Sequence, residues 1–183
     1  MKHLSNLLFE AKILKFIPRS GFPFLGAGRE TVAEHSFSVT FIGYVMSRLV
    51  SGIDALRLIS MCLVHDLPEA RTGDLNYVNK KYVIADEHQA IQDAMRHVPF
   101  GDELISMITE FKQQETLEAR LAHDADQLAF ILDLKSISDT GHTTPEKWIP
   151  VVRKRLKTDI GRQLAEAVLN TKWDAWWMDG YTE

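Results

Sequence analysis

Apolar residues recur at spacings of three and four along most of this chain, which is the period of amphipathic helices. No segment shows sustained alternation of apolar and polar residues between hairpin turns, so little or no β-sheet is expected. The sequence therefore predicts an all-α protein. The expected helices are a first one that ends near residue 17, and then about 31–50, 54–65, 83–97, 102–115, 116–136 and 145–170.

Prolines and glycines separate these helices. Pro18 ends the first helix, because a residue that precedes proline is pushed out of the α region. Segments 19–28 and 67–79 contain further glycine and proline and are interpreted as loops. Asp54 is a suitable N-cap for the helix that follows it.

The length of 183 residues suits one domain. We expect a single domain over 1–183, with a motif-bearing core at about 19–135 and a C-terminal helix and aromatic tail at about 145–183. The 21 Lys and Arg residues against 25 Asp and Glu residues give a formal charge of −4. This acidic balance removes the broad electrostatic drive toward nucleic-acid polymers, so none is expected as a partner.

The chain has a single cysteine, Cys62, and therefore no intramolecular disulfide framework. No stretch approaches the roughly 18–20 apolar residues that a membrane span needs. The first residues lack the long apolar region and the cleavage site of a signal peptide. We therefore expect a cytoplasmic protein that makes no membrane contact.

Ionisable residues occupy four places that do not suit a merely solvated charge. A lone His-Asp pair at a helix end is usually a cap or an ion pair. Two imidazoles with two carboxylates, in contrast, are a common ligand set for a first-row divalent metal, and such a set can leave positions open for water and substrate. The four places are His35, His65-Asp66, Glu69 with Asp74, and His123-Asp124-Ala125-Asp126.

The spacing leaves open which of the two late aspartates joins the histidines. On a helical wheel Asp124 faces the side of Leu121 and Leu128. Asp126 lies among small alanines, which would permit close approach of other helices and a metal. Asp124 is equally suited to a supporting contact, so periodicity does not choose between them.

The motifs, taken in order, resemble the HD-domain superfamily of metal-dependent phosphohydrolases, and most closely its 5′-deoxynucleotidase branch. The resemblance covers about 19–135 and implies a compact single-domain helical bundle of the HD type. The segments that carry it are Arg19-Ser20-Gly21-Phe22, Glu30-Thr31-Val32-Ala33-Glu34-His35, His65-Asp66-Leu67-Pro68-Glu69-Ala70-Arg71-Thr72-Gly73-Asp74, and His123-Asp124-Ala125-Asp126.

The resemblance implies one divalent metal ion, which is Mn, Co, Fe, Ni, Zn or Mg. Glu69 would orient or deprotonate the attacking water, and Asp74 would lie near the leaving group or the sugar. Arg19 would clamp the substrate phosphate. By the resemblance, Phe22 occupies the position at which many relatives have a Trp beside the sugar. The implied metal ligands are His35, His65, Asp66 and Asp126.

The reaction implied by the resemblance is hydrolysis of a (deoxy)nucleoside 5′-monophosphate to nucleoside and phosphate, by a homodimer with one active site per chain. Two alternatives stay open. One is an HD-fold hydrolase of another small phosphoester, and the other is a non-catalytic nucleotide or metal sensor on the same fold. The intact Arg19, Glu69 and Asp74 argue against the sensor, because a binding module needs neither a base nor an acid.

The C-terminal part carries two further patterns. The basic residues of segment 153–157 are interpreted as a solvated helix face, because an apolar stripe marks the opposite side. The tail contains Trp173, Trp176 and Trp177, which we expect to pack on the core or on a subunit interface.

Overall fold

The computed structural model describes residues 1–181, and its regular elements in that range are all helical. The one β-type pairing within 1–181 is an isolated antiparallel bridge between Pro18 and Thr31. The all-α prediction is confirmed. The elements are α1 (Lys2–Ile13), η1 (Leu14–Phe16), α2 (Phe22–Leu25), α3 (Val32–Leu49), α4 (Ala55–Val64), α5 (Glu69–Thr72), η2 (Asn79–Lys81), α6 (Glu87–Met95), α7 (Gly101–Gln113), α8 (Leu117–Asp139), α9 (Pro145–Arg153), α10 (Asp159–Asn170), α11 (Ala175–Met178) and η3 (Asp179–Tyr181).

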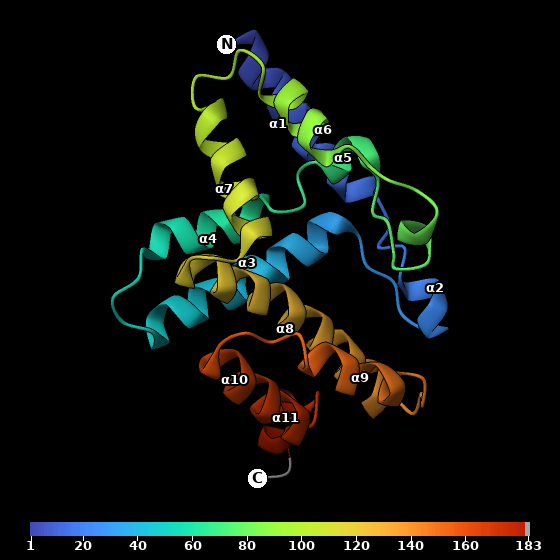
Figure 1. Ribbon diagram of the computed structural model, residues 1–183. Coiled ribbons are helices and arrows are strands. Elements are labelled where there is room, and N and C mark those ends of the chain that lie inside the picture. Colours follow the sequence, from blue (N-terminus) through green and yellow to red (C-terminus); the bar gives the residue numbers. More distant parts are fainter. Residues whose placement is uncertain (182–183) are drawn as a thin grey trace.

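Helices α3, α4 and α8 pack together at the centre of the molecule (Figure 1). Helices α1, α6 and α7 lie on one side of them, and α9, α10 and α11 lie on the other (Figure 1). A large apolar cluster fills the centre and extends to α9 and α10, and a smaller one lies between α1, α6 and α7. Val64 and Leu104 contact both clusters, so the two are joined.

Side-chain caps explain where several helices begin. Thr31 and Glu34 form a capping box at the start of α3, in which each side chain accepts a hydrogen bond from the other residue's backbone N–H. Asp54 caps α4 as the sequence predicts, by accepting from the N–H of Arg57 at 3.0 Å. Thr116 caps α8 in the same manner. These caps place the first turn of each central helix.

Some expected boundaries differ from the observed ones. The expected loops 19–28 and 67–79 contain the short helices α2 and α5. The expected helix 145–170 is broken into α9 and α10. The break has a physical cause, because the side chain of Asp124 accepts the backbone N–H groups of Lys157 and Thr158, which a continuous helix would need. The basic residues of segment 153–157 are exposed, as expected, but they do not lie on one helix face, because α9 ends at Arg153.

The C-terminal tryptophans pack mainly on one another. Trp177 contacts Trp173 and Trp176 edge to face, with ring centroids 4.8 and 4.9 Å apart. Trp176 remains 82% exposed. Packing of this tail into the core is therefore not observed, and the subunit interface stays a prediction. The last two residues of the predicted segment 145–183 lie outside the described range. Within 1–181, no helix combines the length and apolar character that crossing a bilayer requires.

Candidate metal centre

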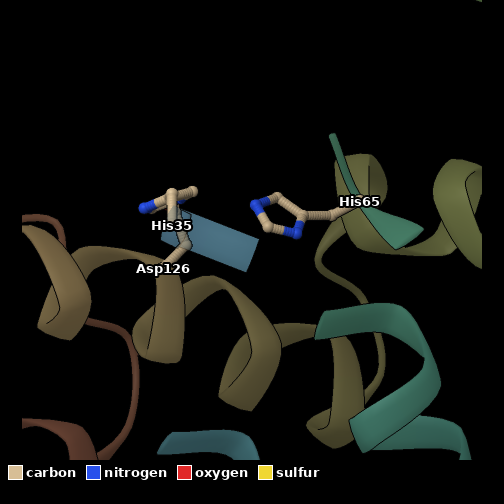
Figure 2. A group of neighbouring side chains, drawn as sticks. All are labelled: His35, His65 and Asp126. Carbon is tan, nitrogen blue, oxygen red and sulfur yellow. The ribbon is translucent and has the colours of Figure 1, made fainter. Parts of the chain in front are cut away.

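Three helical elements bring His35, His65 and Asp126 together. His35 lies in the first turns of α3, His65 ends α4, and Asp126 projects from α8. One ligand atom from each lies within 4.8 Å of the others. Figure 2 shows the three side chains pointing toward a common point from separate elements. The closest pair is His35 Nε2 and Asp126 Oδ1, at 3.0 Å.

Asp66 borders this cluster. Its Oδ2 lies 3.1 Å from His65 Nε2 and 3.7 Å from His35 Nε2. The pair His65-Asp66 is delivered by the end of α4, where the chain turns into α5. The four ligands implied by the sequence resemblance are therefore neighbours, although binding of a metal by all four stays a prediction.

The chemistry of these donors fits a divalent metal ion. His65 Nδ1 lies 2.8 Å from the carbonyl oxygen of Cys62, to which it can donate. This contact directs the lone pair of Nε2 toward the site, which is the usual arrangement of a metal-ligating histidine. His65 Nε2 is buried and has no hydrogen-bond partner of good geometry among residues 1–181. Imidazole nitrogens together with carboxylate oxygens suit a first-row transition metal.

The charges of the cluster are set by burial and by one another. Burial lowers the pKa of His35 and favours its neutral form. Burial would raise the pKa of Asp126, but the hydrogen bond with His35 and the neighbouring positive charges hold it well below its usual range. Burial also favours neutral His65, yet the adjacent Asp66 outweighs it and raises the pKa of His65 to about 8. The lowered pKa values of Asp126 and of Asp66, which lies beside His65, keep these two carboxylates ionised, as ligands of a cation must be.

Asp124 has a different role. It is fully buried. Its Oδ1 accepts the N–H of Lys157 at 2.7 Å, and its Oδ2 accepts the N–H and the hydroxyl of Thr158, each at 2.7 Å. Asp124 therefore anchors the start of α10, and Asp126 is the aspartate that reaches the histidines.

Arg19 lies between acidic residues in the loop before α2. Its Nη1 is 3.4 Å from Asp66 Oδ2 and 3.5 Å from Asp74 Oδ1. The loop is anchored beside it, because Asp74 Oδ2 accepts the backbone N–H of Ser20 at 2.5 Å and its hydroxyl at 2.8 Å. The backbone N–H of Arg19 also donates to the carbonyl of Glu30 at 2.9 Å. The guanidinium is therefore held at the edge of the cluster.

Glu69, at the start of α5, is only 8% exposed. Burial, with added repulsion from Asp66 and Asp74, raises the pKa of Glu69 to about 9. Its Oε2 is buried and has no hydrogen-bond partner within 1–181. In the absence of added positive charge this group is a neutral acid at physiological pH.

One cavity of about 390 Å³ joins these groups. Its walls include every site residue that the sequence predicts except His35, which is fully buried. Phe22 contributes little surface, because its side chain is packed in the core and the residue is only 7% exposed. A cavity of this volume can hold a small-molecule ligand.

Four further residues lie at the site although the sequence pattern did not identify them as site residues. Gln127 Nε2 donates to Asp126 Oδ2 at 2.7 Å, which leaves Oδ1 facing His35. Arg155, expected on a solvated face, lines the cavity with its Nη1 3.5 Å from Gln127 Oε1. Trp148 of α9 also lines it.

Glu30 is the fourth of these residues. Its Oε2 lies 3.6 Å from His35 Nδ1 and 3.9 Å from Arg19 Nε. Burial and the nearby Asp133 raise the pKa of Glu30 to about 8. Glu34, the neighbour of His35 in the sequence, is exposed and serves the capping box.

Comparison with known proteins identifies a family and individual proteins that resemble this chain. A family model described as "HD domain" matches residues 11–168. The chain is 26% identical over 142 residues to the 5′-deoxynucleotidase HDDC2 of Danio rerio, an alignment that covers 70% of this chain and 68% of the relative. It is 27% identical over 160 residues to the 5′-deoxynucleotidase HDDC2 of Dictyostelium discoideum, covering 79% of this chain and 84% of the relative.

Solved structures share the fold. A conserved hypothetical protein from Pyrococcus furiosus superimposes with a TM-score of 0.74 at 28% identity, covering 88% of this chain and 95% of that one. A predicted metal-dependent phosphohydrolase from Magnetospirillum magnetotacticum gives a TM-score of 0.70 at 21% identity, covering 92% of this chain and 90% of that one.

Proposed function

This chain belongs to the HD-domain family, a family of metal-dependent phosphohydrolases, and we propose that it hydrolyses (deoxy)nucleoside 5′-monophosphates to nucleoside and phosphate. The observation that carries the proposal is the cavity, whose walls include three of the four candidate metal ligands, Arg19 and two further carboxyl groups. Two relatives described as 5′-deoxynucleotidases support the choice of substrate.

His35, His65, Asp66 and Asp126 are the residues that would hold the metal ion. When bound, a divalent ion supplies Lewis acidity at the phosphate and lowers the pKa of a water molecule. Arg19 supplies a guanidinium that binds phosphate oxygens and stabilises their charge in the transition state. Its contacts with Asp66 and Asp74, at 3.4 and 3.5 Å, are long enough to be exchanged for a substrate anion.

Glu69 is the proposed proton acceptor for the attacking water. Its pKa of about 9 in the metal-free chain, a value that already includes the lowering effect of the Arg19 charge, keeps it protonated. Added positive charge at the histidine cluster acts in the same direction, so the carboxylate form is available when the site is loaded. Asp74, on the other side of Arg19, is the proposed group near the leaving oxygen or the sugar.

The experiment is phosphate release from a panel of nucleoside 5′-monophosphates and sugar phosphates, with each of several divalent metals added to metal-depleted protein. Asp66→Asn and Glu69→Gln are the test variants, and Glu103→Gln at an exposed position of α7 is the matched control. We expect release from the nucleotides with the wild type and the control, and a loss of at least about 100-fold with either test variant.

Three results would contradict the proposal. Release from sugar phosphates alone supports an HD-fold hydrolase of another phosphoester. Tight nucleotide binding without release supports a non-catalytic sensor. Equal release by all variants would remove Asp66 and Glu69 from the mechanism.

The predicted homodimer and cytoplasmic location are part of the proposal. An exposed aromatic stripe on α3 supports self-association, because contiguous apolar surface is typical of protein interfaces. Phe37 is 72% exposed, Phe41 is 59% exposed, and Tyr44 is 51% exposed. Their rings follow one another along the helix, with centroids 6.5 and 6.4 Å apart.

A further inference from the structure

The cavity has a second, aromatic end that the metal centre does not use. Trp148 from α9, Phe130 from α8 and Tyr77 from the loop after Asp74 line the same cavity as Asp66 and Asp126. The Trp148 ring lies 5.9 Å from that of Tyr77 at 75°, and 6.1 Å from that of Phe130 at 89°. Edge contacts of this kind hold a ring in a defined orientation.

Helix α8 connects the two ends of the cavity. Phe130 follows Asp126 by four residues, so the two side chains lie on the same face one turn apart. Trp148 is held in place by α9. Val152, four residues later on that helix, is fully buried in the core and anchors it. An elongated ligand whose anionic group binds Arg19, at the metal-centre end of the cavity, would therefore place its other end against Trp148 and Phe130.

Phe22 does not supply this aromatic surface. The residue is 7% exposed, and a methyl group added to Gly28 would lie 3.0 Å from two of its ring carbons, Cδ1 and Cε1. The backbone at Gly28 thus covers the ring. A nucleotide base stacks on an exposed aromatic face, and the ring of Phe22 exposes little of its surface.

From this arrangement we infer that Trp148 is the base-stacking residue of the nucleotide cavity, with Phe130 and Tyr77 fixing the orientation of its ring. The inference rests on the proposed nucleotide substrate, and it adds a specificity-determining residue from a segment outside the motif-bearing core. The recognised ligand is a planar aromatic base linked through a sugar to a phosphate.

The first test uses nucleosides, which have a base but no phosphate to release. Titration of the wild type with a purine and with a pyrimidine nucleoside is followed by tryptophan fluorescence. We expect quenching in the wild type, loss of that quenching in Trp148→Phe, and retention of it in Trp176→Phe, the matched control whose side chain is 82% exposed in the wild type. Absence of quenching in the wild type, or equal quenching in both variants, would overturn the inference.

The second test separates base recognition from catalysis. In Trp148→Ala we expect KM for nucleoside 5′-monophosphates to rise about tenfold, the effect of one lost stacking contact. The kcat value, and both constants for deoxyribose 5-phosphate, should change by less than about twofold, because that substrate has no base. Equal increases in KM for both substrates would show a merely structural role. A protein that releases no phosphate but shows Trp148-dependent quenching would refute the proposed reaction and leave the base site intact.

Discussion

Asp124 and Asp126 are two residues apart on α8 and serve opposite sides of that helix. Asp124 accepts three hydrogen bonds at the start of α10, whereas Asp126 Oδ1 lies 3.0 Å from His35 Nε2. A separation of two residues turns the side chain by roughly 200° around a helix, so both cannot face the same cluster. One aspartate therefore supports the fold and the other supports the site.

This division predicts different effects for the same substitution. Asp126→Asn should abolish metal binding and phosphate release, because it removes an ionised ligand from the cluster. Asp124→Asn should keep the ligand set but lower the free energy of unfolding by about 2 kcal/mol, because charge-assisted hydrogen bonds at a buried helix start are lost. Urea unfolding and metal analysis measure both. The reverse pattern would show that the two roles are exchanged.

Metal removal should destabilise the protein as well as inactivate it. A ligand that binds only the folded chain adds about 2.7 kcal/mol at a concentration 100 times its Kd. For a chain of this length that corresponds to a shift in Tm of roughly 5–10 °C between metal-depleted and reloaded protein. His65→Ala should show no such shift, whereas His88→Ala at an exposed position should retain it. A shift that persists in His65→Ala would place the metal elsewhere.

Glu69 should make the metal-free protein less stable at higher pH. Its pKa is raised from an ordinary value of 4.5 to about 9 in the folded state, so the folded chain holds this proton more tightly than the unfolded chain. Stability from this group is therefore complete below about pH 4.5 and falls as the pH rises toward 9. At pH 8, the Glu69→Gln variant should be more stable than the wild type, with a free energy of unfolding higher by an amount on the order of 2 kcal/mol. Urea unfolding at pH 5 and pH 8 measures this, and a wild type whose advantage grows with pH would contradict it.

The contact between α3 and α4 depends on the small size of Gly43. A methyl group at this position would lie 2.6 Å from Cys62 Sγ, which is closer than packing permits. Gly43→Ala should lower the free energy of unfolding by about 1–3 kcal/mol, the usual cost of overpacking. Gly180→Ala, whose added methyl group meets nothing within 4 Å, is the control. Equal thermal stability of the two variants would show that the helices can separate without cost.

Self-association should depend on the aromatic stripe of α3. Replacing Phe41 with aspartate places a charge among the exposed rings of Phe37 and Tyr44, so a dimer that buries them should dissociate. The mass measured by size-exclusion chromatography with light scattering should then change from that of a dimer to that of a monomer. Leu8→Asp, at a position of α1 that is 73% exposed, is the matched control. A monomeric wild type would refute the homodimer.

Much of the fold can be predicted from local sequence patterns. The features that could not be predicted depend on contacts between residues that are distant in the sequence. The helix ends at Thr31 and Asp54 are predictable because a cap and the helix it begins are neighbours in sequence. The break between α9 and α10 is not, because the group that causes it, Asp124, is more than thirty residues away. A helical pattern cannot anticipate an acceptor that arrives from another element.

The sequence by itself determined an all-helical chain and the residues that can carry metal chemistry, since helical period and residue type are local properties. Only the tertiary structure decided that Asp126 rather than Asp124 faces His35, and that Trp148 and Arg155 line the cavity. Periodicity states which way a side chain points from its own helix, but not which other helix it meets. That depends on how α3, α4, α8 and α9 pack, because burial of the joint apolar core selects a single arrangement of their faces.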